Sequence, residues 1–163
     1  MEKVILLVVD EWQKNIWING SGINVEYKEI VKHILGNLDF EIHVGTDSQQ
    51  VKDVYVFATV ICLYVPGNGG TYYVSRHKES LKKYNALGYR LQRETDLSIS
   101  IAEMLKANLI SRDITVHADL NPDPRHKSSK HLKALKNFVL SMGYKCIVKP
   151  DSWAAFVADK HAK

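Results

Sequence analysis

Four acidic residues stand where their carboxylates could converge on one catalytic site. Asp47 and Asp119 each come at the end of a predicted strand, while Glu94 and Asp159 lie in predicted helices. Carboxylates brought together repel one another, and their pKa values rise unless cations neutralise them. Divalent cations with oxygen ligands suit such a cluster. Two ions about 4 Å apart can activate water and stabilise the leaving oxygen in phosphodiester hydrolysis.

Helix geometry singles out Glu94 among the acids of a long predicted helix, 83–109. A helix turns by about 100° per residue, so Glu94 lies nearly in line with Leu87 and Ile101 on the apolar face. A carboxylate on a stripe that faces the core is costly unless something satisfies it. Glu103 falls on the opposite face, where solvent is a sufficient explanation.

Each acid also has a simpler explanation. Asp47 and Asp119 could cap turns, and Asp159 could be a solvated helix residue. The conjunction of the four favours a metal site. We therefore predict two Mg²⁺ or Mn²⁺ ions held by these four residues, with Asp47 on the central strand as the bridging ligand.

The elements that must position these acids follow from hydrophobic periodicity. Alternating apolar residues predict five strands, at 40–46, 53–65, 71–77, 114–119 and 144–149, with the second and third joined as a hairpin. Helical spacing predicts a short helix at 27–38, the long helix, a helix at 128–142 with Phe138 and Met142 inside and Gly143 at its end, and a final helix at 153–161. This order predicts an α/β fold with a mixed five-stranded sheet covered by helices.

Composition and length indicate one ordinary globular domain. The 163 residues are 45% apolar and 25% charged, which excludes disorder and collagen-like repeats. The longest apolar run, Val4 to Val9, could be a strand and is too short to span a bilayer. Cys62 and Cys146 lie in apolar runs and are expected to be buried thiols. We expect a cytoplasmic protein with no membrane partner, in which residues 1–39 form an N-terminal extension with a short helix packed on a domain of residues 40–163.

The strand order and the acids resemble the ribonuclease H fold. The segment that begins at Glu94 resembles the first long helix of that family, which carries a metal-binding Glu. The segment Ala158-Asp159-Lys160-His161-Ala162 resembles the closing Ala-Asp-x-x-Ala of the family. The resemblance implies a nuclease whose metal ligands are Asp47, Glu94, Asp119 and Asp159.

Three further motifs are similar to the YkuK-type ribonuclease H-like proteins. They are Gly45-Thr46-Asp47-Ser48-Gln49, His117-Ala118-Asp119-Leu120-Asn121-Pro122, and Lys149-Pro150-Asp151-Ser152-Trp153-Ala154-Ala155 followed by Val157-Ala158-Asp159-Lys160. Phe156 stands where a small residue is expected in that subfamily, a departure that touches no catalytic position.

Basic residues suggest where nucleic acid could bind. The chain carries a net charge of +4, and one basic stretch without acids runs from Arg125 to Lys136. Its candidate phosphate contacts are Arg125, Lys127, Lys130 and Lys133. A solvated face is the ordinary explanation of such a run, and a second basic patch at 76–83 is the alternative surface.

Two further residues are candidates for supporting roles. His117 is expected to pack beside Asp119 or to tune the metal site from behind its ligands. Lys160 could contact phosphate or be solvated. A zinc site is disfavoured because no pair of cysteines accompanies the histidines. No P-loop or Gly-x-Gly-x-x-Gly motif is present, so no nucleotide cofactor is expected.

These observations favour a metal-dependent nuclease that acts on RNA, DNA or their hybrid. The alternatives are a nucleic-acid-binding module of the same fold with little turnover, and an interaction protein whose acids are incidental. The sequence does not choose the substrate.

Overall fold

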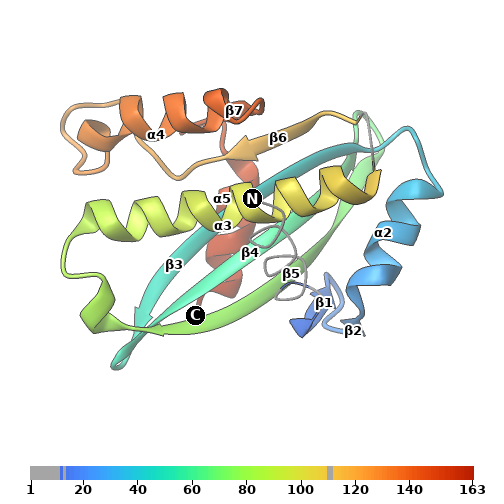
Figure 1. The fold of residues 1–163 in the computed structure, drawn as a ribbon, viewed down its shortest axis with the longest axis horizontal. Coiled ribbons are helices and arrows are strands. Elements are labelled where there is room, and N and C mark those ends of the chain that lie inside the picture. Colours follow the sequence, from blue (N-terminus) through green and yellow to red (C-terminus); the bar gives the residue numbers. More distant parts are fainter. Residues whose placement is uncertain (1–11, 13, 110–111) are drawn as a thin grey trace.

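The structure is a computed structural model that describes residues 12, 14–109 and 112–163 (Figure 1). The possible strand at Val4–Val9 lies outside the described residues. The strands are β1 (Trp17–Asn19), β2 (Asn24–Val25), β3 (Glu41–Val51), β4 (Val54–Val65), β5 (Gly69–Ser80), β6 (Ile114–His117) and β7 (Lys145–Ile147). The helices are α2 (Tyr27–Leu35), the 3-10 helix η1 (Leu81–Lys83), α3 (Leu87–Leu109), α4 (Ser129–Ser141) and α5 (Trp153–His161).

In the described part of the chain the strands form one mixed sheet of seven, in the order β2-β1-β5-β4-β3-β6-β7. β3, β4 and β5 pair antiparallel, and β6 and β7 continue the sheet in parallel with β3. The predicted mixed sheet covered by helices is confirmed. The sheet has two more strands than predicted, because β1 pairs with the outer edge of β5 and β2 pairs with β1. The proposed boundary between residues 39 and 40 stays a prediction.

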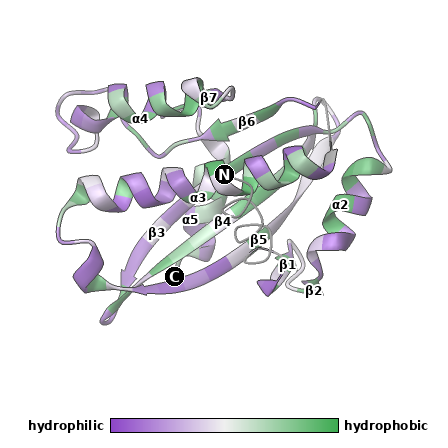
Figure 2. Ribbon diagram, viewed as in Figure 1, coloured by the Kyte–Doolittle hydropathy of each residue, from purple (hydrophilic) through white to green (hydrophobic). Residues whose placement is uncertain are grey.

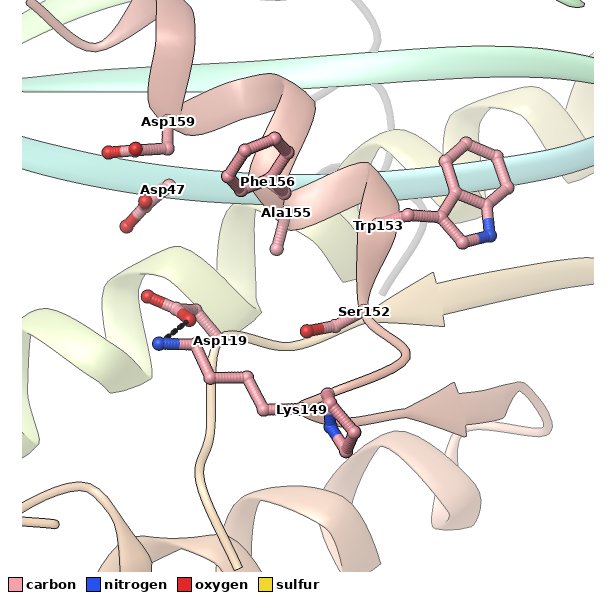
Figure 3. A pocket seen from close by; sticks show the side chains of 9 residues that line it. Asp47, Asp119, Lys149, Ser152, Trp153, Ala155, Phe156 and Asp159 are labelled. Carbon is pink, nitrogen blue, oxygen red and sulfur yellow. Dashed lines mark ion pairs between the residues drawn. The ribbon is translucent and has the colours of Figure 1, made fainter.

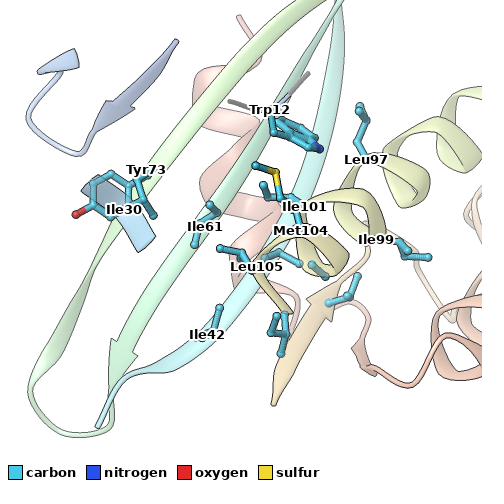
Figure 4. Packing of buried hydrophobic residues seen from close by; sticks show 14 of the residues in the cluster. Trp12, Ile30, Ile42, Ile61, Tyr73, Leu97, Ile99, Ile101, Met104 and Leu105 are labelled. Atoms are coloured by element: carbon cyan, nitrogen blue, oxygen red, sulfur yellow. The ribbon is translucent and has the colours of Figure 1, made fainter. Parts of the chain in front are cut away.

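The two faces of the sheet are covered differently. Phe57 and Ile61 of β4 point into a large core with α2 and α3, whereas Ala58 and Cys62 point toward α5. Figure 1 shows α3 in front of the sheet and α5 behind it. Figure 4 shows how the large side chains of α3 pack on the first face. Both faces of β4 are therefore apolar, and Figure 2 shows this strand in apolar colours between more polar neighbours.

Three details differ from the predicted elements. Asp47 lies inside β3 and not at its end, because β3 continues as a hairpin with β4 as far as Val51. The long helix begins at Leu87, after η1. Phe138 and Met142 do not lie inside: both are exposed, since only Leu135 and Val139 of α4 are buried.

The end of α4 and the final helix follow their predicted limits. Gly143 follows the C-cap Met142 with φ of 92°, the left-handed conformation that favours glycine. α5 spans Trp153–His161. No helix in the described ranges is long and apolar enough to cross a membrane.

Candidate active site

The close approach of α5 to β3 brings Asp159 to the central strand. A Cβ atom added to Gly45 would lie 2.9 Å from the backbone nitrogen of Ala155 and 3.0 Å from the carbonyl carbon of Ala154. Real Cβ atoms do not approach backbone so closely, so glycine is needed at this contact. The small residues of β3 and α5 thus let the two backbones touch, and the helix carries Asp159 toward Asp47.

The parallel register of β3 and β6 brings Asp47 and Asp119 together. Gly45 is level with His117, and each acid follows two residues later. Asp119 lies in the loop just beyond β6, where the strand pairing has ended, and it stands at the level of Asp47 on β3.

Three of the four predicted acids line one open pocket of about 500 Å³. Figure 3 shows Asp47 and Asp159 close together, with Asp119 facing them across the pocket. The residues that line this pocket are Asp47, Asp119, Lys149, Pro150, Ser152, Trp153, Ala155, Phe156 and Asp159.

Glu94 lies behind this pocket, on the other face of β3. Successive side chains of β3 alternate, so Asp47 points toward α5 and Ser48 points toward α3. The Ser48 hydroxyl donates a hydrogen bond of 2.6 Å to Glu94. Glu94 is only 5% exposed and lines a smaller neighbouring pocket that it shares with Asp119. The inward orientation predicted from the helix phase is therefore correct.

Burial and neighbouring carboxylates disfavour the charged forms of Asp47 and Glu94. Burial and the charges of Asp119 and Asp159 raise the pKa of Asp47 from 3.8 to about 7, although the Ser48 N–H group opposes the shift. Burial raises the pKa of Glu94 well above its ordinary value, and the charge of Asp47 adds to it. Negative charge at this site is thus incompletely compensated, which is the electrostatic condition of a cation site.

Besides Ser48, the sequence interpretation missed two further polar partners of the acids. The Lys149 ammonium group lies 2.7 Å from a carboxylate oxygen of Asp119 (Figure 3). The side-chain amide of Gln49 donates a hydrogen bond to Asp159. Both residues belong to the motifs described above, and Lys149 directly precedes the turn into α5. Their position in those motifs was the available signal.

His117 supports the start of α5 and has no hydrogen bond to the acids among the described residues. Its Nε2 lies 2.8 Å from Nδ1 of His43, and its Nδ1 accepts a hydrogen bond of 3.3 Å from the backbone N–H of Ala154. Burial is the main cause that lowers the pKa of His117 to about 3, and the neighbouring His43 is the second cause. The neutral ring thereby anchors the first turn of α5, which in turn carries Asp159.

The predicted basic contacts lie on the surface. Arg125 forms a bidentate ion pair with Asp123, in which Nε lies 3.1 Å from Oδ1 and a terminal guanidinium nitrogen lies 2.5 Å from Oδ2. Lys127, Lys130 and Lys133 are exposed on and before α4. Lys160 lies 5.1 Å from the centre of the Phe156 ring.

The donor chemistry of the four acids fits Mg²⁺ or Mn²⁺, because all four offer the carboxylate oxygens that these ions prefer, although Lys149 already pairs with Asp119. Within the described residues, no group of three or more His, Cys, Asp or Glu side chains is arranged to hold a metal ion. The carboxylates instead take hydrogen bonds or ion pairs from Ser48, Gln49 and Lys149.

The fold and the site together define an α/β domain with acids gathered from a central strand, a neighbouring strand end and the last helix. A sequence model of the family described as Ribonuclease H-like matches residues 24–163. The chain belongs to this family. No curated protein matches the chain at the significance required. No solved structure matches it at that level either.

Proposed function

We propose that this protein is a divalent-metal-dependent nuclease that hydrolyses phosphodiester bonds of RNA or DNA. The observation that carries the proposal is the pocket in which Asp47, Asp119 and Asp159 meet with too little positive charge. Membership of the ribonuclease H-like family adds support for a nucleic-acid partner. The YkuK-type motifs around Asp47, Asp119 and Asp159 support the narrower assignment to that subfamily, and we expect the protein in the cytoplasm.

Asp47, Asp119, Asp159 and Glu94 would hold the two ions, with Asp47 as the shared ligand. When bound, Mg²⁺ or Mn²⁺ supplies an activated water and stabilises the leaving oxygen. The chain itself contributes the placement of the ligands: Ser48 orients Glu94, and Gln49 orients Asp159. Lys149, once released from Asp119, is placed to hold a negatively charged phosphate oxygen at the same pocket.

The second candidate is a nucleic-acid-binding module with little turnover. The ion pair between Lys149 and Asp119 favours it, because the lysine already neutralises one of the acids. In that case Lys149 would act as a permanent substitute for a metal ion, and hydrolysis would lack its activated water.

A cleavage assay with Mg²⁺ or Mn²⁺ tests the proposal. Labelled single strands, duplexes, hybrids and branched substrates are incubated with the wild type and with Asp47→Asn. Metal-dependent cleavage by the wild type and its loss in the variant support a nuclease. Binding without cleavage supports the second candidate. The absence of both binding and metal stabilisation would indicate that the acids are incidental.

A further inference from the structure

Phe156 is an exposed aromatic residue on the rim of the acidic pocket. It is 63% exposed, whereas the buried positions of α5 are alanines. Figure 3 shows the ring beside Asp47 and Asp159. Phe156 and Asp159 belong to the same helix, α5, and are less than one turn apart. A single exposed apolar side chain needs no explanation by itself. At this place it puts an exposed apolar ring at the edge of the pocket of carboxylates.

Trp153 lines the same pocket but is already engaged. Its ring lies 4.7 Å from the ring of His43, 4.8 Å from that of His117 and 5.7 Å from that of Tyr64. Phe156 has no ring–ring contact with any described residue, and the ammonium group of Lys160 is the cation that lies over its ring. Phe156 is therefore the more open of the two aromatic residues that line this pocket, at 63% exposed against 37% for Trp153.

We propose that Phe156 is a stacking platform for one unstacked nucleobase, next to the phosphate that enters the acidic pocket. Phe156 and Asp159 are three residues apart on α5, or about 4.5 Å along the helix axis. Such a separation allows a base to lie on the ring while its neighbouring phosphate reaches the carboxylates. Lys160, one turn after Phe156, places positive charge beside the same nucleotide.

This arrangement selects the class of substrate, and it rests on the proposed function. In a continuous duplex each internal base is stacked on both faces, so the Phe156 ring cannot reach a base face. A single strand or an unpaired end offers such a face, and base–aromatic stacking tolerates any sequence because every base has a π surface. The preferred substrate is therefore single-stranded or unpaired nucleic acid.

Binding in Ca²⁺, a divalent ion that takes carboxylate oxygens, tests the platform without relying on cleavage, and the length of the recovered probe shows whether any hydrolysis occurred. The probe is a fluorescent single-stranded oligonucleotide, compared by anisotropy with an abasic chain of equal length that keeps the phosphates. The wild type should prefer the strand with bases. Phe156→Ala should bind that strand about fivefold more weakly or worse and lose the preference, whereas Phe156→Tyr should retain it. Phe138→Ala removes an exposed phenylalanine of α4 that does not line the pocket, and this variant should bind as the wild type does.

Three outcomes would overturn the platform. One is equal binding of both probes by the wild type, and another is an unchanged preference in Phe156→Ala. The third is a wild-type dimer in sedimentation that Phe156→Ala converts to a monomer, which would make the ring a contact between copies. A failure of metal-dependent cleavage would instead refute the nuclease while leaving the stacking result intact. Equal melting temperatures of wild type and Phe156→Ala would show that the variant is folded.

Discussion

Two regions of the described structure hold carboxylates with little exposure to solvent, and their surroundings shift the pKa values in opposite directions. Glu79 of β5 has a side chain only 10% exposed, and it is surrounded by donors. Arg93 donates to it at 3.0 Å and Tyr84 at 2.9 Å, while His77 lies 3.1 Å away. Burial alone would raise the pKa of Glu79, but these partners hold it below its ordinary value.

The acidic pocket shows the reverse balance. The pKa values of Asp47 and Glu94 are raised, because burial and neighbouring carboxylates outweigh the hydrogen bonds that they receive. Burial is common to both regions, so burial alone does not mark a functional site. What distinguishes the pocket is charge that the protein leaves uncompensated, which is typical of sites that bind a cation or perform chemistry.

The largest expected effect is on cleavage. Glu94→Gln should lower metal-dependent cleavage at least about 100-fold, because it replaces one of the four carboxylates that we propose to hold the ions. Glu103→Gln, on the exposed face of the same helix, should leave the rate unchanged. Initial rates on a single-stranded substrate measure both. The opposite ranking would show that the acid of α3 that matters is not the buried one.

Metal ions should stabilise the pocket and not the Glu79 region. At about 100 times the dissociation constant, Mn²⁺ should raise the melting temperature of the wild type by about 5–10 °C. Asp47→Asn should show a much smaller rise, whereas Glu79→Gln should show the rise of the wild type. Differential scanning fluorimetry provides the measurement. Equal rises in wild type and Asp47→Asn would place the ion elsewhere.

Removing Glu79 should weaken the fold itself. Glu79→Gln removes the negative charge that Arg93 and Tyr84 contact and puts an amide NH₂ group in place of one carboxylate oxygen, and we expect a loss of about 1–3 kcal/mol in the free energy of unfolding. Urea denaturation gives this value. Asp39→Asn, at an exposed acid, serves as the control and should change stability little. A Glu79 variant as stable as this control would show that the cluster contributes nothing.

The pH dependence should separate the two regions further. The pKa of Asp47 is higher in the folded protein than its ordinary value of 3.8, so the folded state binds the extra proton. Its contribution is favourable at low pH and is lost as pH rises from about 4 to about 7. In EDTA, Asp47→Asn should therefore melt a few degrees above the wild type at pH 8, with a smaller difference at pH 5. A difference that grows toward low pH would contradict the raised pKa.

The smallest expected effect is on nucleic-acid binding by exposed lysines, which lie outside both the acidic pocket and the Glu79 region. Replacing Lys130 and Lys133 with Gln should weaken binding similarly for unrelated sequences. It should also lower the slope of log affinity against log salt by about two if both contact phosphate. Anisotropy at several salt concentrations measures the slope, with Lys28→Gln/Lys32→Gln on α2 as the control. If the α4 variant matches the wild type throughout, the basic patch at 76–83 becomes the candidate surface.

Local periodicity was sufficient to predict much of the framework. Residue spacing within one helix was enough to predict the limits of α5 and the inward orientation of Glu94. The hairpin of β4 and β5 was predicted from two apolar runs joined by a short turn. The membership of the four acids in one proposed site was also inferred from the sequence, partly from family resemblance. The structure places three of them around one pocket and Glu94 behind it.

Other features depend on which residues meet across the chain. Lys149 pairs with Asp119, thirty positions earlier, and no local spacing indicates that contact. Phe138 looked like a core residue of α4 but is exposed, because the helix packs through a narrower stripe than its apolar pattern suggests. The sequence by itself thus determined most of the helices and strands and the identity of the four candidate acids, since these depend on local geometry and residue type. Only the tertiary structure decided which three acids share a pocket, which lysine pairs with Asp119 and which aromatic ring is exposed at the rim. The reason is that the sheet register and the approach of α5 to Gly45 set the distances between these residues.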